Sequence, residues 1–160
     1  MEISDFFNYP TADDRAGALG REDDPFLGEC SPGDWALIQQ HADTVIIPQG
    51  GVVIEPGSTA RALLIIIGGR VEVEIGGRRG HARVAVLGTG AVIGELGFFD
   101  GHRADALVRA REESTFMRLS LDSFEHLASV NAELALYILF DVGRILAGRL
   151  RRFEGPGTVL

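Results

Sequence analysis

The feature that most constrains the fold is a series of short, β-branched runs between residues 44 and 120, separated by glycine-containing turns. Runs of this length with evenly spaced turns predict an antiparallel sheet that rolls up on itself, as in a jelly roll. In residues 71–75 apolar and acidic residues alternate strictly, so we expect the valines to face a core and the glutamates to face water. The expected strands are residues 44–47, 52–54, 63–67, 71–75, 83–87, 106–110 and 114–119.

Helical patterns flank this β region on both sides. Ser31 is followed by a proline and has Asp34 three residues after it, which is typical of a helix N-terminus. After Ser120 the apolar period changes from 2 to 3.6, which predicts a short helix capped by Ser120 and a longer helix from the cap Asn131 to about Arg152. The expected fold class is therefore mainly β, an antiparallel β-roll or jelly roll with a short N-terminal helix and a long C-terminal helix.

The length of the chain and its charge limit the number of domains and the kinds of partner that we expect. With 160 residues we expect one domain at 25–152, preceded by an acidic arm at 1–24 and followed by a short tail at 153–160. The net charge of −8 argues against a nucleic-acid-binding surface. Cys30 is the single cysteine, which excludes an intrachain disulfide and a thiolate zinc cluster. Without a secretory signal or an apolar run of about 20 residues, we expect a cytoplasmic protein with no membrane contact.

The segment from Leu134 to Phe140 has no polar face, although it falls within the expected C-terminal helix. A helix of this kind is too apolar to leave one side in water. The β-roll covers one side, and a second copy of the chain is the simplest cover for the other. The sequence therefore predicts a homodimer through the C-terminal helix.

The strongest functional motif is a glycine-flanked glutamate followed by an arginine. It reads Gly90-x-x-Ile93-Gly94-Glu95-Leu96-Gly97-x-Phe99, then Arg103 and Val108-Arg109-Ala110. Held close by one loop, the carboxylate and the guanidinium suit two different roles. They form either a structural ion pair or the two ends of a site for a ligand that carries hydroxyls and a phosphate.

This motif resembles the phosphate-binding cassette of the cyclic-nucleotide-binding domain family, which includes bacterial catabolite activators and protein kinase A regulatory subunits. The resemblance extends over residues 25–152 and includes Pro48-x-Gly50 and Glu55-Pro56-Gly57. It implies a sensor or regulatory module whose ligand is cAMP or cGMP. It also implies that the bound ligand draws the C-terminal helix toward the roll, which passes the signal to a protein partner that the sequence does not identify.

The resemblance also implies the site residues. Glu95 would accept a hydrogen bond from the ribose 2′-hydroxyl, and Arg103 would bind the phosphate. Backbone N–H groups at the start of a one-turn helix, residues 95–98, would point at the phosphate oxygens. The C-terminal helix covers the base in the family, so Arg144 and Arg149 are further candidates. The implied ligand-binding residues are Gly94, Glu95, Leu96, Gly97, Arg103, Ala104, Val73 and Val84.

Several features depart from the family pattern. Counting back from Val108 puts Ala104 where the arginine is expected, the acidic Asp105 lies close by, and a serine or threonine that would add a hydroxyl contact is missing. Arg103 follows Glu95 by eight residues, where the family usually has nine or ten, and His102 precedes it in place of the frequent proline. The alternative hypothesis is therefore a fold that has lost its ligand and acts as a dimerisation or protein-interaction module. The chain ends soon after the long helix, so we expect no DNA-binding domain of the catabolite-activator kind.

Other functional classes have little support. A Gly-x-Ser-x-Gly nucleophile motif is missing, and a phosphate loop ending in lysine is impossible because the sequence contains no lysine. Cupin metal sites need two closely spaced histidines, whereas His81 and His102, the nearest pair, are 21 positions apart. We therefore expect no enzymatic activity, no metal and no cofactor.

Overall fold

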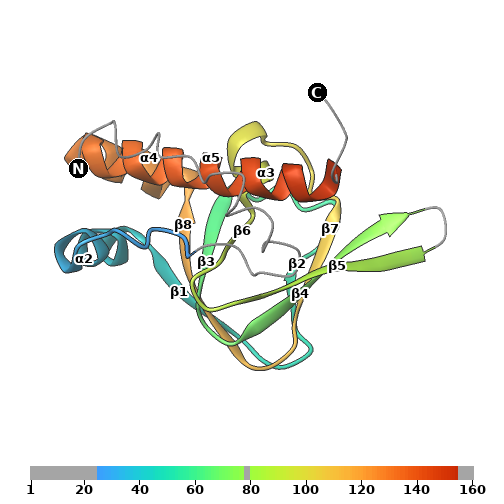
Figure 1. Cartoon of the computed structure of the whole chain (residues 1–160). Helices are drawn as coiled ribbons and strands as arrows, with labels where there is room; N and C mark the ends of the chain where they lie inside the picture. Colours follow the sequence, from blue (N-terminus) through green and yellow to red (C-terminus); the bar gives the residue numbers. More distant parts are fainter. Residues whose placement is uncertain (1–24, 78–79, 155–160) are drawn as a thin grey trace, which may run out of the picture.

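Two antiparallel four-stranded sheets form a β-roll, and helices pack against one of them (Figure 1). The computed structural model describes residues 25–77 and 80–154. The strand order is β1-β8-β3-β6 in one sheet and β2-β7-β4-β5 in the other. The strands are β1 Asp43–Ile47, β2 Val52–Ile54, β3 Ala62–Gly68, β4 Arg70–Gly77, β5 Gly80–Gly88, β6 Val92–Ile93, β7 Ala106–Ala110 and β8 Ser114–Ser120. The expected fold class is confirmed.

The helices begin where the sequence places their caps. The Ser31 hydroxyl accepts a hydrogen bond from the Asp34 N–H at 3.1 Å, and the Asp34 carboxylate accepts one from the Ser31 N–H at 3.2 Å. Ser120 caps its helix in the same way, and Asn131 Oδ1 accepts the Leu134 N–H at 3.0 Å. These side chains satisfy N–H groups that have no partner within the helix. The helices are α2 Pro32–His41, α3 Glu95–Asp100, α4 Leu121–Val130 and α5 Ala132–Glu154.

Most of the apolar side chains of β3 pack against a core on one or the other face of the sheet, whereas Ile67 near its end is 43% exposed. Leu63 and Ile65 pack in a cluster with the helices, whereas Ile66 and its neighbour Leu64 pack inside the roll. Successive residues of a strand point to opposite faces, so a strand covered on both sides is apolar at every position. This explains why β3 does not alternate, whereas residues 71–75 do.

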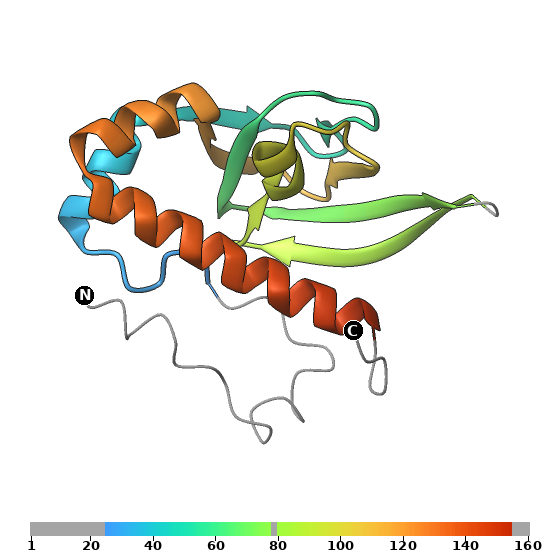
Figure 2. The same cartoon turned by 90° about the horizontal axis from the view of Figure 1, so that it is seen from above.

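In β4 the expected orientation of the valines is confirmed. Val71 is fully buried, and Val73 is partly buried against the core of the roll. Glu72 and Glu74 are half-buried rather than fully exposed. Ile75, the last apolar residue of this run, is 37% exposed because the β4–β5 hairpin extends beyond the body of the roll (Figure 2).

Helix α5 lies across the roll and presents two different faces (Figures 1 and 2). Its inner residues join the core cluster that contains α2, α4 and the β3 sheet. Leu136 and Phe140 lie on the outer face and are each 39% exposed. The apolar run therefore has one covered face and one open face in the single chain. The buried residues of α5 are Leu134, Ala135, Tyr137, Ile138, Asp141, Val142 and Ile145.

The first described residues are fixed to both the roll and α5. The Phe26 N–H donates to the carbonyl oxygen of Gly90 at 2.8 Å. The Leu27 N–H donates to Oδ2 of the buried Asp141 at 2.6 Å, and Arg144 Nε donates to the other carboxylate oxygen at 2.9 Å. Asp141 is thus a buried charge with two hydrogen-bond donors, and it fixes the middle of α5.

Two of the expected segments are not described by the structure. The acidic arm at residues 1–24 lies outside the described residues, and so do residues 155–160 of the expected tail. Within the described ranges, every helix is too short or too polar to cross a bilayer.

Candidate functional site

Helix α3 follows β6 through Gly94, and two constraints require glycine at this position. Gly94 has a φ of +83°, in the left-handed region. A Cβ here would lie 2.6 Å from the carbonyl oxygen of Ala62 on β3. Glycine tolerates both the φ value and the close approach, whereas an L-amino acid with a side chain does not. The protein's own backbone therefore explains Gly94, whatever its role toward a ligand.

Gly97 lies in α3 itself and is different. Its φ is not positive, and a Cβ would meet only the carbonyl oxygens of Ala60 and His102, each at 3.5 Å. These are ordinary van der Waals distances, so packing alone does not require glycine here. Glycine in a helix costs about 1 kcal/mol relative to alanine, so an alanine here would be compatible with the packing of α3.

Glu95, the first residue of α3, is a buried acid that pairs with the last helix. Its Oε1 lies 2.5 Å from Arg149 Nη1, and the two side chains are 10% and 18% exposed. Arg149 Nη2 also donates to the carbonyl oxygen of Val92 at 2.7 Å. One guanidinium therefore contacts both β6 and α3. Of the two candidates on the C-terminal helix, Arg149 lies at Glu95, whereas Arg144 donates to Asp141.

The opposite end of α3 is held by Arg61, which lies just before β3. Its Nε and Nη2 donate to the carbonyl oxygen of Phe98 at 3.1 and 2.8 Å, and Nη2 also donates to that of Phe99 at 2.8 Å. The last carbonyl groups of a helix have no partner within the helix, so this cation caps α3. Gly101, with a φ of +69°, ends the helix beside the Arg61 side chain.

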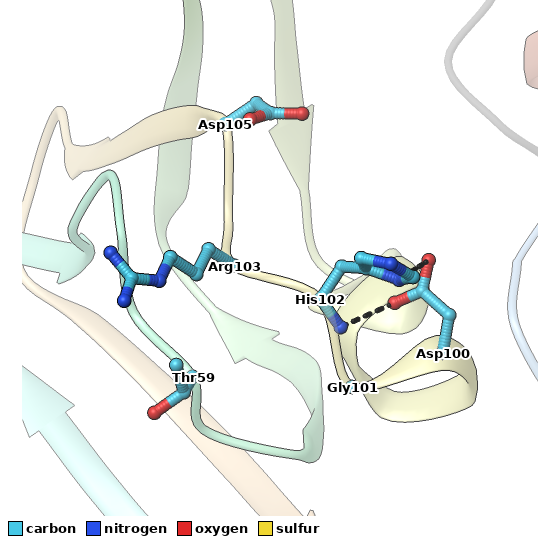
Figure 3. A pocket seen from close by; sticks show the side chains of 6 residues that line it. All are labelled: Thr59, Asp100, Gly101, His102, Arg103 and Asp105. Carbon is cyan, nitrogen blue, oxygen red and sulfur yellow. Dashed lines mark hydrogen bonds and ion pairs between the residues drawn. The ribbon is translucent and has the colours of Figure 1, made fainter.

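Arg103 does not approach the Glu95 carboxylate closely enough for an ion pair. Its side chain is exposed and lines an open surface cavity of about 750 Å³ with Thr59, Asp100 and Asp105. Figure 3 shows the guanidinium directed toward the loop that carries Thr59. Within the described part of the chain, Arg103 makes no hydrogen bond or ion pair. The structural ion pair of this motif is formed with Arg149 instead.

The loop between α3 and Arg103 is ordered by Asp100. Oδ1 of Asp100 accepts the His102 N–H at 2.8 Å, and Oδ2 lies 3.2 Å from His102 Nδ1 (Figure 3). The backbone hydrogen bond from His102 lowers the pKa of Asp100 below its ordinary value. This carboxylate stays ionised and keeps the turn that leads to Arg103 in place.

The remaining predicted residues lie in different surroundings. Leu96 is 65% exposed on the outer side of α3. Ala104 exchanges backbone hydrogen bonds with the β2–β3 loop, at 2.9 Å to Ser58 and 2.7 Å from Gly57. Val73 packs against the core of the roll. The Val84 side chain lies outside the part that the structure describes, although its backbone belongs to β5.

Sequence reasoning missed Arg61. A signal was present, because Arg61 is the single arginine between positions 22 and 69 and immediately precedes the apolar strand β3. An isolated guanidinium next to a strongly apolar strand indicates a specific partner. That partner could not be named from the sequence, since α3 is 37 positions away.

Among residues 25–77 and 80–154, histidine, cysteine and carboxylate side chains do not gather in the groups of three that a metal ion would need.

A rolled antiparallel sheet, a glycine–glutamate helix inserted after β6 and a long helix that contacts this glutamate define the class of cyclic-nucleotide-binding domains. The chain belongs to this family. The cyclic nucleotide-binding domain family matches residues 44–131, which include all of β1 except Asp43, the strands β2 to β8, and the helices α3 and α4.

Two curated proteins and one solved structure illustrate the likeness. Glutaminase 2 of Bradyrhizobium diazoefficiens is 32% identical over 124 residues, 78% of this chain and 19% of that protein. The cAMP-activated global transcriptional regulator CRP of Salmonella typhimurium is 30% identical over 115 residues, 71% of this chain and 54% of that protein. The chain thus spans about a fifth and about half of these relatives.

The structure of a cyclic nucleotide-binding domain from Methylobacillus flagellatus KT superposes with a TM-score of 0.75 at 25% identity. The match covers 84% of this chain and 78% of that one. The shared fold includes the antiparallel sheets and the flanking helices described above.

Proposed function

We propose that this chain is a sensor module that binds cAMP or cGMP and passes the signal through α5. Glu95 accepts the ribose 2′-hydroxyl, and the segment from Gly94 to Gly97 lies against the cyclic phosphate with Leu96 and Ala104 beside it. Val73 and Val84 line the wall for sugar and base. The function is binding rather than catalysis.

One observation carries this proposal. Glu95 is a buried carboxylate at the position where the family accepts the ribose hydroxyl, within a chain that matches the family over residues 44–131. Arg149 occupies one oxygen of this carboxylate, and the carboxylate can accept a further hydrogen bond from a ligand hydroxyl. Gly97 adds support, because its missing side chain is not explained by contacts within the protein.

Arg103 supplies the charge for the phosphate. Arg61 already donates to the carbonyl oxygens at the end of α3, and Arg149 donates to Glu95. Arg103 is exposed and has no such partner among the described residues, so its guanidinium is available to an anion next to the cassette.

The output passes through α5 and a second copy of the chain. The outer face of α5 exposes Leu136, Phe140, Gly143, Ala147 and Leu150. Their spacing alternates between four and three residues, which is typical of a helix–helix seam. We therefore propose a homodimer through α5. Since the net charge is −8, a protein is a better recipient of the signal than nucleic acid.

Titration calorimetry with cAMP and cGMP tests the proposal. We expect binding, and Arg103→Ala should weaken it by about 1.5–3 kcal/mol, the contribution of a hydrogen bond to a charged group. Gly97→Ala should weaken binding while leaving the unfolding transition in place, because its Cβ fits the protein but faces the ligand. Absence of heat at millimolar nucleotide would contradict the proposal.

A second function has one specific observation in its favour. The Arg149 guanidinium already satisfies Glu95, so the carboxylate has a partner without a nucleotide. A fold that has lost its ligand would use this pair to fix α5 for dimerisation or protein interaction. This second function predicts a dimer that binds neither cAMP nor cGMP. The same titration therefore distinguishes it from the sensor module.

A further inference from the structure

Helix α3 lies along residues 60–62, where the β2–β3 loop enters β3. A Cβ on Gly94, just before the helix, would lie 2.6 Å from the carbonyl oxygen of Ala62. A Cβ on Gly97, three residues later, would lie 3.5 Å from that of Ala60. The two segments therefore run in opposite directions, and α3 packs against backbone that belongs to the roll.

The same loop fixes the chain beyond α3. The Ala104 N–H donates to the carbonyl oxygen of Ser58 at 2.9 Å, and the Gly57 N–H donates to that of Ala104 at 2.7 Å. Arg103 directly precedes Ala104, so its backbone is held next to the β2–β3 loop. Figure 3 shows the Arg103 side chain directed toward the same loop, at Thr59.

Arg61 lies between these two regions of contact and binds the end of α3. Its guanidinium donates to the carbonyl oxygen of Phe98 at 3.1 and 2.8 Å and to that of Phe99 at 2.8 Å. Its own carbonyl oxygen accepts the N–H of Leu121, the first residue of α4, at 2.9 Å. The Arg61 backbone is thus fixed at α4, while its side chain fixes the end of α3 that leads to Arg103.

The other contacts at this end of α3 are of a different kind. Phe98 is buried, and its ring meets that of Phe124 edge-on at 5.5 Å between centroids. Apolar burial is not directional, whereas hydrogen bonds fix an orientation. Asp100 binds His102 within the same loop and so does not tie this loop to the roll. Among the described residues, Arg61 supplies the side-chain hydrogen bonds from the roll to this end of α3.

From this geometry we propose that Arg61 is a positioning residue for cyclic nucleotide binding. The end of α3 is bound to Arg61, and Ala104 is bound to the β2–β3 loop, so the short segment between them has a fixed course. Arg103 therefore keeps its place relative to Glu95. The inference rests on the proposed function, in which Glu95 contacts the ribose and Arg103 contacts the phosphate. Arg61 contributes by holding these two contacts at the spacing of one ligand.

The test measures cAMP affinity by titration calorimetry in variants of the full chain. Arg61→Met keeps the apolar length of the side chain but has no donor, and it should bind about tenfold more weakly than the wild type. Arg118→Met is the matched control, because Arg118 is an exposed arginine on β8 that pairs with Asp43. Its affinity should equal that of the wild type. Arg61→Lys keeps the cation but loses the planar fork, so its affinity should lie between those of Arg61→Met and the wild type.

A second measurement separates positioning from a general loss of stability. In an Arg103→Ala background the phosphate contact is already gone, so Arg61→Met should weaken binding by less than about threefold. A general destabilisation would instead lower the affinity by the same factor in both backgrounds. Hydrogen exchange gives a readout without ligand. The amides of Phe98 and Gly101, which donate to carbonyl oxygens within α3, should exchange faster in Arg61→Met than in Arg118→Met.

The outcomes separate the positioning role from the proposed function. If the wild type binds cAMP and Arg61→Met binds it equally well, the positioning role is wrong and the proposed function stands. An equal loss with and without Arg103 would also overturn the positioning role. If Arg61→Met does not fold, Arg61→Lys decides, and an affinity equal to that of the wild type overturns the proposal. If the wild type binds no cyclic nucleotide, the proposed function is wrong and Arg61 has no positioning role in binding, whereas hydrogen exchange still decides whether Arg61 holds α3.

Discussion

Arg149 Nη1 lies 2.5 Å from Glu95 Oε1, across 54 positions of the sequence. This ion pair joins the last helix to the first residue of α3. Because both side chains are largely buried, we expect the pair to affect the stability of the fold.

A double-mutant cycle with Glu95→Gln and Arg149→Ala should give a coupling free energy of about 1–3 kcal/mol in chemical denaturation, since the pair is partly desolvated. The exposed pair of Arg118 and Asp43, 3.8 Å apart and 46% and 76% exposed, serves as the control. Its coupling should stay below about 0.5 kcal/mol. Equal coupling in both pairs would show that burial does not strengthen the Glu95 contact.

Gly94→Ala should destabilise the fold by about 1–3 kcal/mol. The new Cβ would lie 2.6 Å from the Ala62 carbonyl oxygen, and φ is +83°. Gly148→Ala is the matched control, because its Cβ meets nothing within 4 Å in a helix and should stabilise by up to about 1 kcal/mol. Thermal unfolding of the two variants, measured side by side, should show shifts of opposite sign.

Asp141→Ala should cost about 2–4 kcal/mol, because the Leu27 N–H loses its buried acceptor and Arg144 loses the hydrogen bond to this carboxylate. Asp141→Asn keeps an oxygen for Leu27 and should cost less. Urea denaturation gives both values. A loss as large in the asparagine variant would assign the effect to charge rather than to the hydrogen bond.

Replacing Leu136 and Phe140 together by serine should convert the dimer to a monomer, since both side chains lie 39% exposed on the outer face of α5. Ile46→Ser removes an apolar side chain that is 61% exposed on β1 and should leave the dimer intact. Light scattering at micromolar concentration measures the mass. If the wild type is a monomer, the proposed dimer interface on the outer face of α5 is wrong.

Stability should fall as pH rises above about 9. Burial raises the pKa of Cys30 to about 12 from 9.0, and the nearby carboxylates of Asp34 and Asp141 add to this. The folded state then holds the thiol proton more tightly than the unfolded chain. This contribution is fully present below the unfolded pKa and is lost as pH rises through 9 to 12.

The measurement is the denaturation midpoint at pH 8, 9 and 10 for wild type and Cys30→Ala. The pKa of Tyr137 is also raised by burial, to about 12, but from 10.0, so its effect begins at higher pH. Between pH 8 and 10 the wild type should lose more stability than the alanine variant. Parallel curves would show that Cys30 does not titrate differently on folding.

The sequence by itself determined the fold class, because its signals are local. The alternation at Val71 and Val73, the glycine turns and the caps Ser31, Ser120 and Asn131 each specify structure within a few residues. The same holds for Gly94, whose place between an apolar run and a glutamate marks the start of α3. These features placed the helices and most of the strands, but they did not predict the two-residue strand β6, Val92–Ile93. The family resemblance then pointed to Glu95.

The tertiary structure alone decided which charges meet. Glu95 pairs with Arg149 rather than with Arg103, although Arg103 is only eight residues away, and Arg61 reaches Phe98 across 37 positions. Proximity along the chain did not predict either contact. The reason is that rolling the sheet brings β3 to one end of α3, while the packing of α5 brings Arg149 to the other, and both arrangements follow from the core as a whole.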